Sequence, residues 1–408
     1  MKVCMLSYSF YESDTRILQY TKALTERGDA VDVLALRDEG KPTFEIMDGV
    51  RIYRIMGRKV NERSQLVYLT RVLRFLLYST WVIARRQISE RYQVIHVHSV
   101  PDFLVFAALA PKLLGAQVIL DIHDILPEFY ASKFACGTDS FLFKLLVLVE
   151  KFSIAFADHV IIANEIWYQR LLSRSVRPEK CSTIINYPDP QLFCTRPKVR
   201  ADDKFLIIYP GTLNIHQGLD IAIRAFAKVV GGLPNAEFHI YGEGAAKPSL
   251  RSLARELGLD GRVVFHGFLT SPEIAPIMAA SDLAVVPKRA SSPFGNEAAS
   301  TKIMEFMSVG VPVIVSRTKI DTFYHDDTRV RFFESENEVD LANAILELYL
   351  HPELRAALVA NGAEYVRRHN WREKQREYLD IIDSLVRSRN GRATLRDSSS
   401  LVSLAKKG

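Results

Sequence analysis

The most informative stretch of the sequence is PFGNEAASTKIMEFMSVGVPVIVS, which occupies residues 293–316. Ser300 or Thr301 is a good N-cap for a helix that begins at this point. The closing Gly-Val-Pro-Val-Ile-Val, which starts at Gly310, indicates a turn followed by a buried strand. A helix that leads directly into a buried strand is typical of α/β proteins with parallel sheets.

The same stretch brings charged residues together at the predicted start of the helix. Glu297 and Glu305 are separated by seven residues, and Lys302 lies between them. A helix N-terminus presents free N–H groups and a partial positive charge, so it binds phosphate, and Lys302 adds a full charge. The Glu305 carboxylate can accept two hydrogen bonds from a diol such as ribose, and Glu297 could hold a second polyol. The alternative is a capped, solvated helix with two surface glutamates.

Short apolar runs alternate with helix-period segments along most of the chain, and this alternation predicts parallel, doubly wound sheets. The first half has predicted strands at 3–7, 30–36, 94–98, 117–121, 159–163 and 183–186, with helices at 14–27, 65–90, 102–114, 140–157 and 166–173. The second half has predicted strands at 205–209, 237–241, 263–266, 283–287, 311–315 and 330–333, with helices at 219–230, 247–257, 271–279, 300–308 and 339–350.

The pattern predicts two domains, because a chain of 408 residues is too long for one ordinary core. The predicted fold class is α/β, with two Rossmann-like domains that face a central cleft and bind ligands beyond the carboxyl ends of their strands. The first domain spans 1–190, and a helix at about 368–388 packs back on it. The second spans 200–365, and a segment rich in proline and charge, 186–204, links the two. The polar segment 390–408 is predicted to be a disordered tail.

Composition limits the class of protein further. Four scattered cysteines without a CxxC pair indicate reduced thiols and not a disulfide framework or a zinc site: Cys4, Cys136, Cys181 and Cys194. The N-terminus resembles a first strand and not a signal peptide. We find no uncharged apolar run of about 18 residues, the length that spans a bilayer. The expected location is therefore the cytoplasm.

Several predicted strands of the second half end in glycine turns. Gly211 and Gly218 flank the turn in YPGTLNIHQGLDIAIRAF, Gly242 and Gly244 follow the strand in HIYGEG, and Gly267 follows another strand. One glycine loop is weak evidence for a ligand site. Several such turns at the same sheet edge are stronger evidence, because they open a common cleft.

These segments resemble a known family. GTLNIHQGLD, IYGEG, VVFHGFL, SDLAVVP and EAASTKIMEFMSVGVPVIVS resemble the nucleotide-sugar domain of retaining glycosyltransferases of family 4, which have the GT-B fold. The first half is similar to the same family more loosely, in DTRILQYTKALTERGDAVDVLAL, VIHVHSVPD, DIHDILPE and ADHVIIANE. The resemblance covers about residues 1–388, and its most specific part is the pair of glutamates followed by Gly-Val-Pro-Val.

The resemblance implies roles for the residues in the opening stretch. Glu305 would bind the ribose of a nucleotide diphosphate sugar, and Glu297 would bind hydroxyls of the donor sugar. The backbone N–H groups of Ser300, Thr301 and Lys302 would hold the diphosphate. Catalysis would then depend on Glu297, on Lys302 and on a histidine of the first domain.

The resemblance also places residues from other strand ends at the site. Gly267 and Phe268 would lie near the base, and the turns at Gly211 and Gly242 would line the donor. His123, in DIHDILPE, would project toward the reacting sugar.

The alternative for His123 is a strand-end histidine bonded to Asp124 or Glu128, and Asp124 is itself a candidate on the acceptor side. His96 and His98 alternate along one strand and are predicted to be structural.

The sequence departs from the family at two cationic positions. The family places an arginine after the strand-end glycine and a lysine five residues later, whereas this chain has Thr212 and Gln217. Two lost phosphate-binding cations would weaken leaving-group stabilisation unless another group replaces them. Lys302 is the best substitute, with Lys288 and Arg289 in reserve.

His216, if protonated, is a further substitute. Neither an Asp-x-Asp triplet nor a metal-spaced His/Cys/Asp cluster is apparent, so the predicted site is free of metal and cofactor.

The first loop of the family often carries a glycine pair, and this chain has YSFYESDTR there instead. Asp14 and Arg16 are therefore candidates for contact with the acceptor or the donor phosphate. The alternative, equally weighted, is a helix cap and a surface charge.

Segment 64–86 is predicted to be an amphipathic, strongly basic helix. Residues 51–92 contain ten basic and two acidic residues, an excess that is larger than the +6 of the whole chain. One interpretation is a core helix with a solvated arginine stripe. The other is a helix that lies on an anionic membrane surface, so the protein would be peripheral on the inner face of the cell membrane. Nucleic acid is not an expected partner, because no nucleic-acid motif accompanies the arginines.

The function expected from these observations is a retaining glycosyltransferase. It would move a sugar from a nucleotide diphosphate donor to a hydroxyl of a lipid-linked or surface-polysaccharide glycan. One alternative is a non-catalytic GT-B protein that binds nucleotide or glycan. A second is a nucleotide-sugar epimerase on the same fold.

Overall fold

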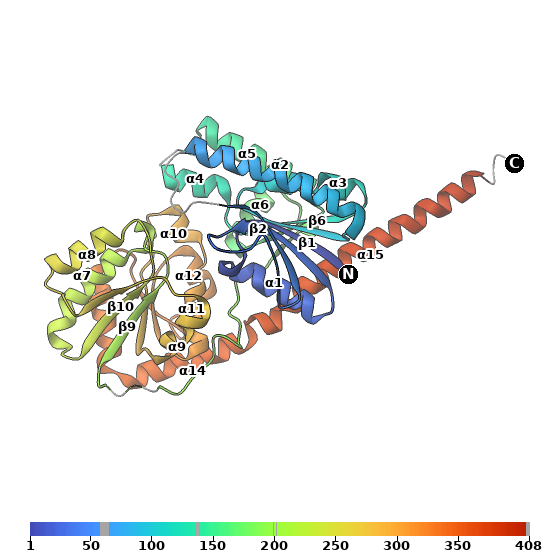
Figure 1. Ribbon diagram of the computed structural model, residues 1–408. Coiled ribbons are helices and arrows are strands. Elements are labelled where there is room, and N and C mark those ends of the chain that lie inside the picture. Colours follow the sequence, from blue (N-terminus) through green and yellow to red (C-terminus); the bar gives the residue numbers. More distant parts are fainter. Residues whose placement is uncertain (58–64, 135–136, 138, 199, 201, 405–408) are drawn as a thin grey trace. The chain divides into compact units, whose positions relative to one another are not determined.

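The computed structural model describes residues 1–57, 65–134, 137, 139–198, 200 and 202–404. The chain forms two compact units, the first made of Met1–Ile185 with Gln375–Gly408 and the second of Asn186–Lys374. Each unit contains one sheet of mainly parallel strands with helices on both faces (Figure 1). The predicted α/β class with two doubly wound sheets is therefore confirmed.

The sheet of the first unit has eight strands in the order β3-β4-β2-β1-β5-β6-β7-β8. The strands are β1 (Lys2–Phe10), β2 (Ala30–Arg37), β3 (Phe44–Met47), β4 (Val50–Gly57), β5 (Val94–His98), β6 (Gln117–Ile122), β7 (His159–Ile162) and β8 (Cys181–Thr183). The central strands are continuous apolar runs because helices cover both of their faces. The strands that follow β1 in the chain are added first on its β2 side and then, from β5 onward, on its other side. The switch point of this sheet, where ligands bind in such folds, therefore lies at β1.

The helices of the first unit divide between the two faces of this sheet. They are η1 (Tyr11–Ser13), α1 (Thr15–Glu26), α2 (Gln65–Glu90), η2 (Asp102–Ala108), α3 (Leu109–Leu113), α4 (Leu126–Phe134), α5 (Phe141–Phe156), α6 (Glu165–Arg174), η3 (Pro178–Lys180) and the end of α15 (Trp371–Leu404). In Figure 1, α2 and α5 lie on one face of the sheet, and α1 lies on the other. On the α1 face, Tyr378 of α15 stacks on Tyr20 at 4.1 Å between ring centroids.

Helix α15 differs from expectation at its end. The segment 390–408 was expected to be a disordered tail, but α15 continues to Leu404. A helix that has already formed elongates by one residue at little cost, so a polar composition alone does not end it.

An antiparallel hairpin at the edge of the first sheet was not predicted. β3 pairs with β4, and the turn between them is Asp48-Gly49, both with positive φ angles of 50° and 81°. This is the geometry of a type I′ hairpin, for which Asp-Gly is a strong sequence signal. The four-residue β3 is too short and too exposed to give a clear apolar alternation.

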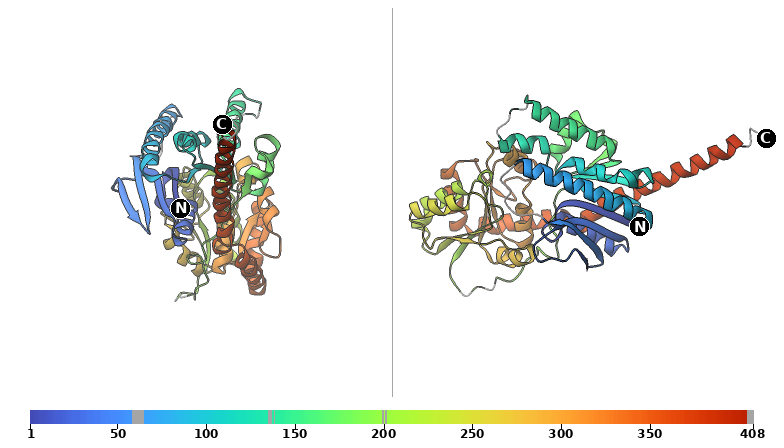
Figure 2. Two further views of the ribbon diagram at one scale, coloured as in Figure 1. Left: turned by 90° about the vertical axis from the view of Figure 1, so that its right-hand side faces the viewer. Right: turned by 45° about the horizontal axis from the view of Figure 1, so that its top comes forward.

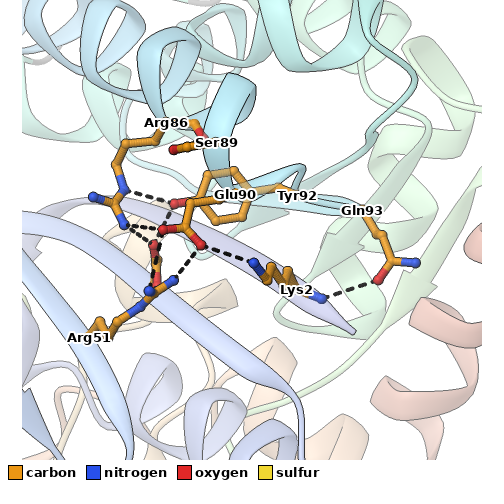
Figure 3. Close-up of polar contacts among 8 residues, drawn as sticks. Lys2, Arg51, Arg86, Ser89, Glu90, Tyr92 and Gln93 are labelled. Carbon is orange, nitrogen blue, oxygen red and sulfur yellow. Dashed lines mark hydrogen bonds and ion pairs between the residues drawn. The ribbon is translucent and has the colours of Figure 1, made fainter.

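A buried carboxylate ties the C-terminal end of α2 to the sheet. Asp32 of β2 is fully buried and accepts hydrogen bonds from Arg51 (2.6 Å), Arg86 (2.7 Å) and Tyr92 (2.5 Å). Figure 3 shows the second layer of this cluster, in which Glu90 binds Arg51, Arg86 and Lys2. Removal of one partner would leave the others buried and unpaired, so the cluster fixes where α2 lies.

The sheet of the second unit is fully parallel, with six strands in the order β11-β10-β9-β12-β13-β14. The strands are β9 (Phe205–Pro210), β10 (Ala236–Tyr241), β11 (Val263–His266), β12 (Leu283–Val286), β13 (Val313–Ser316) and β14 (Arg331–Phe333). The order reverses between β9 and β12, which is the switch point of this sheet.

Helices cover both faces of the second sheet as well. They are η4 (Ile215–Gln217), α7 (Leu219–Val229), η5 (Val230–Gly232), α8 (Lys247–Glu256), α9 (Ser271–Ala280), α10 (Pro293–Glu297), α11 (Thr301–Val309), α12 (Lys319–Tyr324), α13 (Glu338–Leu350) and α14 (Pro352–Arg368). α7 packs against α8 and α13, and α11 packs against α9 and α14. A continuous apolar core fills the space between α7, α13 and the central strands.

Candidate active site

The carboxyl ends of β9, β10 and β12 lie at the switch point of the second sheet, where the predicted donor residues gather. Gly211 directly follows β9 and has a φ angle of 141°. A Cβ atom at Gly211 would lie 2.3 Å from Cε and 2.8 Å from Nζ of Lys302. A side chain at position 211 would therefore be strained by the φ angle and would require Lys302 to shift from its place over the end of β9, beside the ring of Tyr209.

The turn after β10 packs on this turn through backbone atoms alone. Gly242 also has a φ angle of 141°, and a Cβ there would lie 1.9 Å from the carbonyl oxygen of Gly211. The Gly211 N–H donates to the carbonyl of Tyr241 at 2.8 Å. The two glycine turns thus support each other and hold the backbone under Lys302 in place.

Helix α11 begins beside Lys302. Ser300 is its N-cap, but the Ser300 side chain accepts no capping hydrogen bond, and its hydroxyl is buried with no partner among the described residues. The N–H groups of the first turn have no side-chain cap and remain available to an anion. The predicted phosphate-binding helix start is thus present in the second unit.

The other candidate cations at this sheet edge are already engaged. Lys288 is buried and pairs with Asp321 at 2.9 Å. Arg289 pairs with Asp220 at 2.5 Å and with Glu336 at 2.8 Å.

His216 does not supply a positive charge at neutral pH, because burial lowers its pKa and Lys302 and Lys288 lower it further. Lys302, by contrast, makes no ion pair with a described residue. Burial lowers the pKa of its ammonium group, and the nearby Glu305 carboxylate opposes that shift. Lys302 is thus the cation of this edge that an anionic ligand would meet.

The two glutamates differ in their surroundings. Glu305 lies one turn into α11, and burial raises its pKa while Lys302 and Thr301 lower it. Glu297 is the last residue of the short helix α10 and lies 3.2 Å from Lys319. Lys319 was not predicted, because its partner is 22 residues away in the chain.

The two positions that depart from the family are polar and neutral. The Tyr209 hydroxyl donates to the carbonyl of Thr212 and to the side chain of Gln217, both at 3.1 Å. Gln217 therefore braces the β9 turn. Gly267 follows β11 with open space around it, and Phe268 is exposed, so neither has a packing role in the unit that would compete with a ligand.

In the first unit, His123 follows β6 and is the outer member of a buried polar network. Its Nε2 lies 3.3 Å from Asp121 and 3.2 Å from Nδ1 of His98. Of the predicted alternative partners of His123, Glu128 pairs instead with Arg174, and the hydrogen-bond-distance contact of His123 is to Asp121. Burial lowers the pKa of His123, but the Asp121 carboxylate outweighs it, and the net shift is upward.

Arg16 completes this network from the inside. It is buried and donates from Nε and Nη2 to the two oxygens of Asp121, at 2.8 and 2.7 Å, and from Nη1 to the carbonyl of Ile184. Arg16 is thus not a surface charge, and its predicted contact with a ligand stays a prediction. The Arg16 guanidinium and His123 hold the pKa of Asp121 well below its usual range, although burial opposes them.

The remaining predicted residues of the first unit are placed as follows. Asp14 is the N-cap of α1, and its side chain accepts from the Ile17 N–H at 3.3 Å, so the helix-cap alternative describes it. Asp124 is half-buried beside His123, and burial raises its pKa while His123 lowers it. His96 and His98 are fully buried, and burial lowers their pKa values to about 3 and about 4.

His96, His98 and Asp121 have ligand atoms within 4.8 Å of one another, a spacing that a metal ion could use. The chemistry does not favour a metal there, because the Arg16 guanidinium already binds both oxygens of Asp121. A cation in the same place would be repelled by Arg16 at short range. The expected metal-free donor site stays a prediction.

Two family models match the chain and together span most of it. The "Glycosyl transferase 4-like domain" model matches residues 13–186, and the "Glycosyl transferases group 1" model matches residues 195–365. The chain is a group 1 glycosyltransferase. Among curated relatives, the transferase is 23% identical over 300 residues to the alpha-D-kanosaminyltransferase of Streptomyces kanamyceticus. The aligned region covers 69% of this chain and 75% of that protein.

Solved structures show that the transferase has the GT-B fold. Sucrose-phosphate synthase from Thermosynechococcus elongatus has a TM-score of 0.76 at 19% identity and covers 95% of this chain and 100% of that one. Anabaena HepE in complex with UDP-glucose has a TM-score of 0.71 at 19% identity, with coverage of 94% and 100%.

Substitution of the glycine under Lys302 tests the geometry of the β9 turn. We expect Gly211→Ala to lower the free energy of unfolding of the second unit by roughly 1–3 kcal/mol, because it adds backbone strain at positive φ and displaces Lys302. Gly267→Ala is the matched control, with open space and no positive φ, and we expect a change within about 0.5 kcal/mol. Chemical unfolding of both variants measures this, and equal effects would contradict the assigned contact.

The raised pKa of His123 predicts a pH dependence of stability. Its protonated form stabilises the folded state below its ordinary pKa, and this contribution is lost as the pH rises through the raised pKa. The stability advantage of the native protein over His123→Gln should therefore be largest in mild acid and should shrink toward alkaline pH. Unfolding midpoints of the two proteins at several pH values measure the difference, and a difference that does not vary with pH would disprove the His123–Asp121 coupling.

Proposed function

We propose that the transferase moves a sugar, with retention of configuration, from a nucleotide diphosphate donor to a hydroxyl of a lipid-linked or surface-polysaccharide glycan. One observation carries the donor half of this proposal. Lys302 is an ammonium group with no ion pair among the described residues, and it lies over Gly211 at the start of α11. A single cation at an uncapped helix start suits a leaving diphosphate.

The rest of the donor is accommodated on either side of Lys302. Glu305, one turn into α11, accepts hydrogen bonds from the ribose hydroxyls, and Glu297 accepts from hydroxyls of the sugar. The family and the UDP-glucose complex of Anabaena HepE support this class of donor. The donor is thus held at both polyol ends, with its phosphates between them.

The chemical step consists mainly of positioning and charge stabilisation. The bond between the anomeric carbon and the phosphate oxygen breaks, and the acceptor oxygen bonds to the same face of the sugar. The departing phosphate oxygen takes the acceptor proton, so no separate general base is needed. Lys302 and the N–H groups of α11 stabilise the charge that develops on the leaving diphosphate.

A second candidate function has one observation in its favour. Thr212 and Gln217 are neutral, and Gln217 is engaged by Tyr209. A group 1 protein with a weakened diphosphate site would bind nucleotide or glycan without turnover and would support a partner enzyme.

Substitutions at Lys302 and Glu305 separate the two roles in the donor site. We expect Lys302→Met to lower kcat by about 10²- to 10³-fold with a smaller effect on donor affinity. We expect Glu305→Ala to weaken donor binding by about 10- to 100-fold, because hydrogen bonds to a charged group are lost. Lys204→Met is the matched control, because Lys204 pairs with Glu237 near the opposite end of β9. Unchanged turnover and binding in both site variants would refute the site assignment.

Thermal stabilisation by donors tests the proposed function before any acceptor is known. The full chain is heated with UDP-, GDP-, ADP- and dTDP-sugars, with and without Mg²⁺. We expect one donor to raise the unfolding midpoint, and we expect Mg²⁺ to leave that shift unchanged, because Lys302 and α11 replace the metal. No shift from any donor would favour the non-catalytic candidate, and a shift that requires Mg²⁺ would overturn the metal-free site.

A further inference from the structure

The outer face of α2 is apolar where a solvated helix would be polar. Its inner stripe is buried against the unit through Val72, Phe75, Ser79, Ile83 and Gln87. On the opposite side Leu69, Leu73, Leu77, Trp81 and Ile88 are exposed, and Leu77 is 72% exposed. The arginine stripe predicted from the sequence is thus only one edge of a larger apolar surface. Arg58, Lys59 and Arg63 of the basic segment lie outside the described residues.

Two neighbouring elements extend this surface. The η2–α3 segment contacts both α2 and α5, and all of these elements lie on one side of the first sheet (Figure 2). Leu113 of α3 is 79% exposed, Phe141 of α5 is 83% exposed, and Leu148 and Phe152 of α5 are exposed as well. We call the outer sides of α2, η2–α3 and α5 the apolar face.

Every exposed charge on the apolar face is positive. The carboxylates of these elements are turned inward, where Glu90 binds Arg51 and Arg86, Asp102 accepts from Ser99, and Glu150 binds Arg174. The exposed cations are Arg74, Arg85, Lys144 and Lys151, and none of them pairs with a described carboxylate. An apolar surface with unpaired cations is complementary to an anionic lipid surface.

The helix α2 lies on the unit and is not free to cross a bilayer. Val67–Glu90 is long and apolar enough for a membrane span by length and composition, although it is not an uncharged apolar run. However, its inner stripe packs on the unit, and its C-terminal end is held by the buried Asp32 cluster. Arg71, Arg74, Arg85 and Arg86 also lie within this segment. These features suit a helix in the plane of the interface.

A second copy of the chain fits the apolar face less well. A two-fold interface places the same surface against itself, so Arg74, Arg85, Lys144 and Lys151 of two copies would face one another. Like charges without carboxylate partners repel across such an interface. Anionic headgroups supply the missing negative charge.

We propose that the apolar face, formed by α2, η2–α3 and α5, docks on the surface of a bilayer that contains anionic lipids. The exposed leucines and aromatic residues enter the boundary between headgroups and acyl chains, and the cations bind headgroup phosphates. The proposal does not depend on the donor site. It gives the protein a peripheral location on the membrane and places the first unit where a lipid-linked acceptor would be found.

Flotation of the full chain with vesicles tests this docking. We expect binding to phosphatidylcholine vesicles that contain phosphatidylglycerol, weak binding to phosphatidylcholine alone, and loss of binding at high salt. Leu77→Glu, Leu113→Glu and Phe141→Glu should each lower the partition coefficient by about ten-fold or more. Lys144→Gln and Lys151→Gln should lower it by roughly five-fold each on anionic vesicles only.

Leu350→Glu is the matched control, because Leu350 is 59% exposed but belongs to the second unit. We expect it to float like the native protein, and unfolding midpoints show that all variants remain folded. Absence of flotation, equal binding to neutral and anionic vesicles, or native binding by the three glutamate variants would each overturn the proposal. A dimer in solution that the same variants dissociate would also overturn it, in favour of a second copy.

Discussion

The ammonium group of Lys302 lies where a side chain on the residue beneath it would have to be, and that residue is a glycine with a φ angle of 141°. Gly211 has no Cβ atom, and Gly242 packs against the backbone of Gly211 from the neighbouring turn. Other cations of this edge are neutralised inside the protein, Lys288 by Asp321 and Arg289 by Asp220 and Glu336. Among the described residues named at this edge, Lys302 and the start of α11 therefore stay available to a ligand.

In the first unit a buried negative charge, the Asp121 carboxylate, raises the pKa of a partly exposed histidine, His123. Asp121 is fixed from inside by Arg16, and so it keeps its charge although it is fully buried. That charge favours a proton on His123 against the effect of burial. The residue that governs the chemistry of His123 is thus two positions before it, and the residue that governs Asp121 is 105 positions away.

The alternation of apolar runs and helix-period segments was enough to predict both sheets, because parallel strands are buried on both sides and leave an unambiguous pattern. The β3–β4 hairpin has no such pattern, although the Asp48-Gly49 turn was a usable signal.

Side-chain pairing was harder to predict. Arg16 was expected to contact a ligand or to be a surface charge, and Lys288 and Arg289 were held in reserve as phosphate-binding cations, but all three are paired inside the protein. Spacing within a segment carries no information about a partner from another strand or helix. Helix periodicity indicated α2 correctly but not the direction of its apolar face, because that depends on which side the sheet lies.

The stacking of Tyr378 on Tyr20, together with its hydrogen bond to His96, has a consequence for biosynthesis. These three side chains are fully buried in the first unit, yet Tyr378 belongs to the last helix of the chain. The ribosome makes all of Asn186–Lys374 before this helix appears, which takes about ten to forty seconds at typical elongation rates. During that interval the nascent first unit exposes an aromatic and imidazole surface that its own C-terminus will later cover. The part of the chain that is made first is therefore completed last.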